Sequence, residues 1–408
     1  MNTIDSVKAD QTKPEPIFNQ QFIILWATNF FAVASMSSFF LFPLFILSHG
    51  GTKADIGILM GAMSLSSVLG RPWVSQVIDR IGRKKSYLLG IMISTIMPVT
   101  HIYFKGELSD FYFLLFGARI IHGVGIAFSF TASTTIIADI LPKERLNEGL
   151  GIFGITAVSG MAFGPAVAEP IIRFFGYNAF FLTASLFGAI SWLLQTGLKE
   201  TYISLSQSSS SVSFWMVLKR KKVFGIAIMA LLFGSGMAAQ SGFISPYAEH
   251  LGIKGVSLFF ITYSATAVVV RIFGGRLADR VGEDRIVPWA FIISAMGFLS
   301  LLALQNNWYL VLSGLICGTG HAFIFPCLNA IAVRNEPIEI RGKIAGVFTG
   351  GMDSGMLCGS ILLGYVGEWF GYKPIFLTTS ILLVFASLFF LGYLSKIVRA
   401  SITEPIQA

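Results

Sequence analysis

Long apolar runs alternate with short polar segments along the whole chain. In the first half the runs cover about residues 18–48, 55–78, 86–104, 111–138, 149–172 and 179–198. In the second half they cover about residues 223–248, 256–278, 287–305, 308–332, 342–368 and 374–396. Each run is long enough to cross a bilayer as a tilted helix. The pattern predicts an all-α membrane protein with twelve transmembrane helices.

The polar segments divide the chain into five parts. We expect a cytoplasmic tail at 1–17, a six-helix bundle at 18–198, a cytoplasmic linker at 199–222, a second bundle at 223–396 and a cytoplasmic tail at 397–408. The first part carries charges of both signs and lacks the basic start and short apolar segment of a signal peptide. It is therefore interpreted as a tail that stays on the chain.

The distribution of Lys and Arg gives the orientation. If the N-terminus is cytoplasmic, the inner segments hold 20 of the 29 basic residues and the outer segments hold 5. Cytoplasmic loops of membrane proteins carry such an excess. Both termini are predicted to be cytoplasmic.

The two halves repeat one another. The sequence Asp-Arg-x-Gly at 79–82 recurs at 279–282, an offset of 200, whereas Gly123 and Gly318 are related by an offset of 195. The difference predicts five extra residues in the first half, in the outer loop FKGELSD. Parallel repeats of six helices, with a substrate site between them near the midplane, are typical of some secondary transporters.

Composition and motifs exclude several functions. Mean hydropathy is +0.73 and 12% of residues are charged, against about a quarter in soluble domains. The net charge of +8 comes mainly from basic residues in the predicted loops, so no nucleic-acid partner is predicted. Cys317, Cys327 and Cys358 lie in apolar runs and are interpreted as packing residues. With no metal-ligand spacing and no catalytic motif, we expect no metal, no cofactor and no enzymatic activity.

The segments RPWVSQVIDRIGRKKS and RIFGGRLADRVGEDR resemble the loop signature of the major facilitator superfamily, Gly-x-x-x-Asp-Arg-x-Gly-Arg-Lys. Ser75 replaces the leading glycine in the first copy, and Glu283 and Asp284 replace the basic pair in the second. The resemblance implies a gate at the cytoplasmic face, formed by Asp79, Arg80, Gly82, Arg83, Asp279, Arg280 and Gly282. The alternative is that the basic residues only satisfy the positive-inside rule.

The fourth helix contains GARIIHGVGIAF, which resembles the superfamily's Arg-x-x-x-Gly-x-Gly motif. The resemblance implies that Arg119, deep in the membrane, takes part in proton coupling. His122 lies three residues later, on the same helix face. We interpret His122 as a hydrogen-bonded core histidine in preference to a coupling residue.

The fifth helix contains GITAVSGMAFGPAVAEP, similar to the Gly-x-x-x-Gly-Pro-x-x-Gly-Gly motif of drug:proton antiporters. Gly160, Gly164 and Pro165 match, whereas Ala168 and Glu169 replace the last two glycines. The resemblance implies export, and ordinary small-residue packing is the alternative. Glu169 is expected near the outer surface, as a weaker functional candidate.

Asp353 is the deepest carboxylate, in the middle of the eleventh helix. A charge there is costly and marks function in many transporters, so we expect proton or substrate-charge coupling. The alternative is a permanent structural pairing with Arg119, Arg271 or a backbone group. Arg71 and Arg271 are expected to snorkel or to form structural pairs.

Further polar residues lie within the apolar runs. His321, near the midplane, could titrate close to neutral pH, although a structural role is the default. Plausible cavity contacts are Asn29, Gln240, Tyr247 and Asn329.

We therefore expect a monomeric secondary transporter of the bacterial inner membrane, resembling drug:proton antiporters and working by alternating access on a small molecule and protons. Three alternatives stay open. One is proton-coupled uptake of a sugar, carboxylate or amino-acid derivative, and another is export of a metallophore-like anionic metabolite. The third is a sensor or scaffold that transports nothing.

Overall fold

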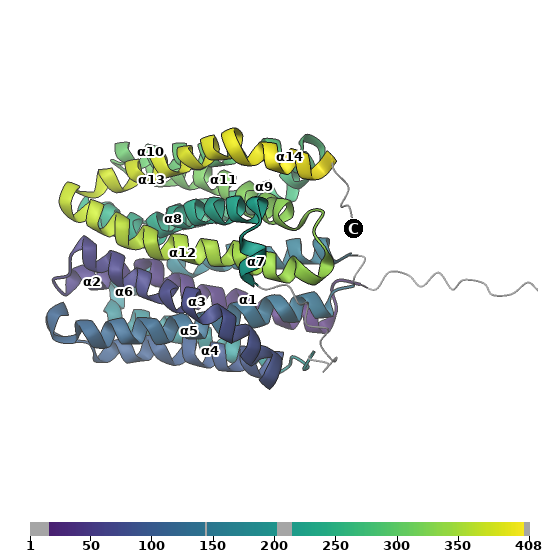
Figure 1. Ribbon diagram of the computed structural model, residues 1–408. Coiled ribbons are helices and arrows are strands. Elements are labelled where there is room, and N and C mark those ends of the chain that lie inside the picture. Colours follow the sequence, from purple (N-terminus) through teal and green to yellow (C-terminus); the bar gives the residue numbers. More distant parts are fainter. Residues whose placement is uncertain (1–15, 143–144, 202–213, 404–408) are drawn as a thin grey trace, which may run out of the picture.

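The computed structural model describes residues 16–142, 145–201 and 214–403, and within these ranges it contains helices and no strand (Figure 1). The first half comprises α1 (Gln20–Ser38), η1 (Phe39–Leu41), α2 (Phe42–Ser48), α3 (Lys53–Ile81), α4 (Arg83–Thr100), η2 (His101–Tyr103), α5 (Leu108–Ile140) and α6 (Leu146–Gln195). The second half comprises α7 (Phe214–Leu218), α8 (Lys221–His250), α9 (Ser257–Val281), α10 (Glu283–Ser300), η4 (Leu301–Ala303), α11 (Asn307–Val333), α12 (Ile338–Phe370), α13 (Tyr372–Phe389), η5 (Phe390–Leu394) and α14 (Ser395–Thr403).

The helices have the length and composition of membrane spans. Among the described residues, nine helical segments qualify on both criteria. The 50 residues of α6 are interrupted at Gly176 (φ 77°), where two helices meet at a kink. By length alone α3 and α12, with 29 and 33 residues, are also sufficient. The all-α membrane fold is confirmed, and the count of twelve stays a prediction.

The helices form two groups that lie side by side in Figure 1, α1–α6 in one and α8–α14 in the other. Within each group the helices pack closely, as α1 does on α6 and α8 on α12. Between the groups the main contacts are those of α3 with α12 and of α6 with α9.

The sequence repeat is visible in the backbone. Gly82 and Gly282 separate equivalent helix pairs at φ 96° and 95°, and Gly176 and Gly371 do so at φ 77° and 90°. Only glycine adopts such angles without strain. The same helix breaks therefore occur at equivalent places in both groups.

The five extra residues of the first group are mostly helical. The short helices η2 and η4 still keep the offset of 200, but Gly123 lies 15 residues after the start of α5 and Gly318 only 11 after the start of α11. Four of the five residues therefore lengthen α5 by about one turn. The expectation of a longer loop is wrong in this respect. A capping box between Glu107 and Asp110 starts the extra turn.

The hydrophobic core connects the groups unevenly. We call the end of the bundle where α1 begins and α14 ends the near end, and the opposite end the far end. At the far end, residues of the first group such as Phe40, Ile56 and Met60 belong to the same core as the second group. At the near end the first group has a core of its own, which includes Phe22 and Ile136.

Candidate functional site

Arg119 is completely buried on α5. Its Nε donates to the Leu59 carbonyl oxygen at 3.3 Å, and its Nη2 lies 3.7 Å from the Met60 sulfur. The guanidinium carbon is 5.1 Å from the ring centre of Phe39 and 4.8 Å from that of Phe42. These two aromatic faces stabilise the cation. In the described part of the chain Nη1 has no hydrogen-bond partner.

Two histidines lie beside this arginine. His122 packs edge-on against Phe39 with 4.9 Å between ring centres, and His101 does so at 5.5 Å. Both are fully buried and interact electrostatically with Arg119. The Nδ1 of His101 bonds the Met97 carbonyl at 2.8 Å.

Three nitrogens of these imidazoles lack partners among the described residues: both of His122 and Nε2 of His101. His122 is buried in the core, and the hydrogen bonds expected for it are not found among the described residues. We call Arg119, His101, His122, Phe39 and Phe42 the Arg119 cluster. His101 belongs to no motif, which explains why sequence reasoning missed it.

The structure does not pair Arg119 with Asp353. The described polar contacts of Arg119 go to α3, in its own group. Asp353 lies partly buried on α12, in the other group, where it has an interaction of its own. A permanent Arg119–Asp353 ion pair is therefore not part of this state of the protein.

The second group holds a smaller polar site around His321. Its Nδ1 lies 2.5 Å from the Tyr263 hydroxyl, which also interacts with Gln240. A cavity of about 20 Å³ adjoins these side chains, enough for one water molecule. Arg271 is partly buried and its Nη1 donates to the Gly154 carbonyl on α6 at 3.3 Å. It thus bonds across the groups and does not snorkel.

The remaining cavity candidates differ in their surroundings. Asn29 donates to the Thr156 hydroxyl at 2.5 Å and so joins α1 to α6. Tyr247 stacks on Tyr372 at 5.5 Å, and its hydroxyl has no partner among the described residues. Asn329 is partly buried on α11. Only the Tyr247 hydroxyl is both buried and unpaired.

The glycines of α6 bring that helix close to α1. A Cβ at Gly160 would lie 2.9 Å from the Phe30 carbonyl, and one at Gly164 would overlap the Ala34 carbonyl and the Ser37 hydroxyl. The Ser37 hydroxyl donates to the Gly160 carbonyl at 2.8 Å. Pro165 follows inside the helix. The motif therefore forms a tight helix contact next to a proline, whatever further role it has.

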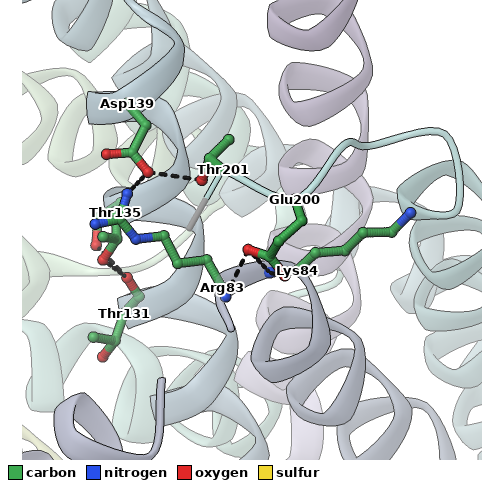
Figure 2. Close-up of polar contacts among 8 residues, drawn as sticks. Arg83, Lys84, Thr131, Thr135, Asp139, Glu200 and Thr201 are labelled. Carbon is green, nitrogen blue, oxygen red and sulfur yellow. Dashed lines mark hydrogen bonds and ion pairs between the residues drawn. The ribbon is translucent and has the colours of Figure 1, made fainter. Parts of the chain in front are cut away.

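At the near end, two carboxylates hold the loop between α3 and α4 (Figure 2). The Arg83 guanidinium forms an ion pair with Asp139, which also accepts from the Thr201 hydroxyl at 2.7 Å. Glu200 accepts from the backbone N–H groups of Arg83 and Lys84 at 3.0 and 3.2 Å. It therefore caps α4 where the helix dipole favours negative charge. Sequence reasoning missed both carboxylates, because each lies more than fifty residues from the loop.

The expected gate residues lie at the near end. Arg83 does reach a neighbouring helix, but its partner Asp139 belongs to the same group. Arg80 and Arg280 are exposed. The side chains of Asp79 and Asp279 lie outside what the structure describes.

The second copy of the loop keeps the same interaction with the charges exchanged. Glu283 begins α10 and forms an ion pair with Arg334 at the end of α11. Asp284 accepts from the Arg399 Nε at 3.2 Å. The basic pair that this copy lacks is thus replaced by acidic residues with basic partners.

Two helical groups that repeat one another, a buried arginine within a membrane span and ion-paired loops at one end are the features of a secondary transporter. The chain belongs to the Major Facilitator Superfamily, whose sequence profile matches residues 24–267 and 255–405. It is a multi-pass membrane transporter and not an enzyme.

The relatives include a protein named as an exporter and one named as a multidrug resistance protein. The chain is 26% identical over 370 residues to the staphylopine export protein of Staphylococcus aureus, covering 87% of this chain and 91% of that protein. It is 27% identical over 347 residues to multidrug resistance protein 2 of Bacillus subtilis, covering 80% and 83%.

Solved structures agree with the fold. A crystal structure of the nucleoside transporter NupG matches with a TM-score of 0.73 at 15% identity, over 91% of this chain and 99% of that one. A peptide-bound transporter of the POT family matches with a TM-score of 0.75 at 15% identity, over 94% and 96%.

Proposed function

We propose that this transporter exports a small organic molecule in exchange for protons. The observation that carries the proposal is the Arg119 cluster, a fully buried cation beside two imidazoles with unpaired nitrogens. Buried ionisable groups in membrane proteins mark proton and substrate pathways. The names of the relatives from S. aureus and B. subtilis support export as the direction.

In this mechanism the two six-helix halves, 18–198 and 223–396, rock against each other around a central substrate site. Asp353 binds and releases the proton, Arg119 supplies the electrostatic field, and the Asp-Arg-x-Gly loops gate the near end. Substrate and proton exclude each other, which produces exchange. The near end faces the cytoplasm of a bacterium, and the protein works as a monomer in the inner membrane.

A second candidate is export of an anionic metabolite of the metallophore type. The observation that favours it is the set of unpaired nitrogens on Arg119, His101 and His122. The Nη1 of Arg119 and the protonated ring nitrogen of His122 are N–H donors, and they could hold carboxylate groups that enter the cluster once the helices separate. The two candidates differ in the charge of the ligand whose transport is coupled to proton movement.

Proton flux in proteoliposomes tests both candidates. Vesicles with a pH-sensitive dye are challenged in turn with lipophilic cations, sugars, organic acids and metal chelates. We expect one class to cause a pH change that Asp353→Asn abolishes and that Glu148→Gln, an exposed carboxylate at the near end, leaves unchanged. Flux with lipophilic cations supports the first candidate, and flux with acids or chelates the second. Ligand-driven flux that survives Asp353→Asn contradicts the coupling role.

A further inference from the structure

At the far end, two carboxylates each reach across the boundary to the start of a helix in the other group. Glu169 on α6 accepts hydrogen bonds from the backbone N–H groups of Gly255, Val256 and Ser257, at 2.7, 3.1 and 2.8 Å. Ser257 is the first residue of α9. Glu368 on α12 accepts from the backbone N–H of Lys53, the first residue of α3, at 3.0 Å.

The two contacts are related by the internal repeat. In the first group α6 caps α9, and in the second α12 caps α3, so the same helix pairing occurs twice with the groups exchanged. The residue equivalent to Glu169 is Gly364, and Glu368 lies one helical turn beyond it. A carboxylate thus reaches across the boundary from either side.

The chemistry of these contacts favours a strong interaction. The first N–H groups of a helix have no partners within the helix, and the helix dipole adds positive potential there. An ionised carboxylate that accepts several N–H bonds forms charge-assisted bonds. Glu169 also pairs with Arg173 at 2.5 Å, and its side chain is only 9% exposed. Little water is available to replace the donors of Glu169, whereas Glu368 is exposed and its contact is the weaker of the two.

The carboxylates lie over a tight apolar seal between the groups. A Cβ at Gly57 on α3 would lie 3.0 Å from the Cα of Gly364 on α12. Phe40 lies 5.2 Å from Phe260 between ring centres, and its carbonyl accepts from the Ser245 hydroxyl at 2.8 Å. This structure is therefore closed at the far end.

We infer that Glu169 and Glu368 form a latch that holds the far end closed and must release in every transport cycle. The inference rests on the proposed alternating access, because a transporter has to open its far end to exchange ligand there. Ion pairs and hydrogen bonds within one group can persist through such a motion. The two crossed caps cannot, because their partners move apart.

Chemical labelling of a cysteine beneath the latch tests this inference without any substrate. Cys317, Cys327 and Cys358 are first replaced by serine, and Ser245→Cys then places one thiol in the far-end seal, where the parent side chain is 1% exposed. Right-side-out and inside-out vesicles are treated with a membrane-impermeant maleimide. Only an open far end exposes this thiol to the side that the far end faces.

The variants are Glu169→Gln, Glu368→Gln and their combination, with Glu107→Gln as the matched control. Gln keeps the size of Glu and removes the charge. Glu107 is also a far-end carboxylate that caps a helix, but it caps α5 within its own group. We expect each latch variant to label faster, by on the order of tenfold for Glu169→Gln, and the control to label like the parent.

Three outcomes decide the inference. Faster labelling in both latch variants and unchanged labelling in the control supports it. Unchanged labelling in the latch variants overturns it, even if the parent transports. Equal acceleration in all variants also overturns it, because that result means a general loosening. If Glu169→Gln does not fold, Glu169→Asp replaces it and the same criterion applies. If the latch variants label faster but no ligand drives proton flux, the latch is supported and the proposed antiport is contradicted.

Discussion

Glu283 forms an ion pair with Arg334 across α10 and α11, with the polarity opposite to that of its counterpart in the first group. Glu283 occupies the position equivalent to Arg83, and Arg334 the position equivalent to Asp139. The offsets are 200 and 195, the two values found along the repeat. Both residues of the contact therefore carry the opposite charge in the second group, and the ion pair is kept.

We predict that exchanging the charges of the first pair is tolerated when both residues change together. Arg83→Glu and Asp139→Arg, each alone, place like charges side by side and lower both transport and thermal stability. The double variant restores part of each, with a coupling energy of about 1 kcal/mol for this partly exposed pair. A double-mutant cycle on the melting temperature in detergent measures it. Additive losses would show that the pair contributes nothing.

A second prediction concerns the contact of α6 with α1. Gly164→Ala inserts a methyl group where the Ala34 carbonyl and the Ser37 hydroxyl lie. We expect a loss of about 1–3 kcal/mol in stability, because the helices must separate. Gly151→Ala on the same helix is the control, since a Cβ there meets nothing within 4 Å. Equal melting temperatures for the two variants would contradict the tight contact.

Arg119 gives a third prediction. Arg119→Gln removes the buried cation and should abolish ligand-driven proton flux while leaving a folded protein. Arg119→Lys keeps the charge but cannot reproduce the bond to Leu59 together with the planar contact on Phe39 and Phe42, so it should retain only part of the flux. Arg285→Gln, an exposed arginine at the near end outside the gate residues, should have no effect on coupling. Full flux in Arg119→Gln would make the cluster structural.

The fourth prediction concerns the cap of α4. Glu200→Ala leaves the backbone N–H groups of Arg83 and Lys84 without their acceptor. A lost helix cap costs about 1 kcal/mol. We expect the free energy of unfolding to fall by that amount and the melting temperature to fall with it. Lys199→Ala, which changes the adjacent exposed side chain, should leave the melting temperature unchanged. The same loss in both variants would assign the effect to the segment and not to the cap.

The helices and their repeat could be predicted because each depends on neighbours in sequence. Apolar runs of sufficient length predict spans, and the offsets of 200 and 195 predict the equivalent breaks at Gly82 and Gly282. The sequence predicts loop where α5 has its extra turn, because the capping box of Glu107 and Asp110 lies within a polar segment.

The side-chain partners could not be predicted in the same way. The sequence places both Arg119 and Asp353 deep in the membrane, but depth says nothing about which way each helix faces. Asp139, Glu200 and Glu368 act on residues 56, 117 and 315 positions away. No local pattern indicates such distant partners. His101 was missed because one polar residue in an apolar run carries no signal of what surrounds it.

The uneven core determines what kind of motion this state permits. The groups share one core at the far end, whereas the first group is separately packed at the near end. While Glu169 and Glu368 keep the far end closed, that end stays fixed, and displacement increases along the helices away from it. The 29 residues of α3 span about 43 Å, so a rotation of about 10° separates the near ends by about 7.5 Å. Distances between spin labels on the two groups should therefore broaden steadily along α3 from its far end towards its near end.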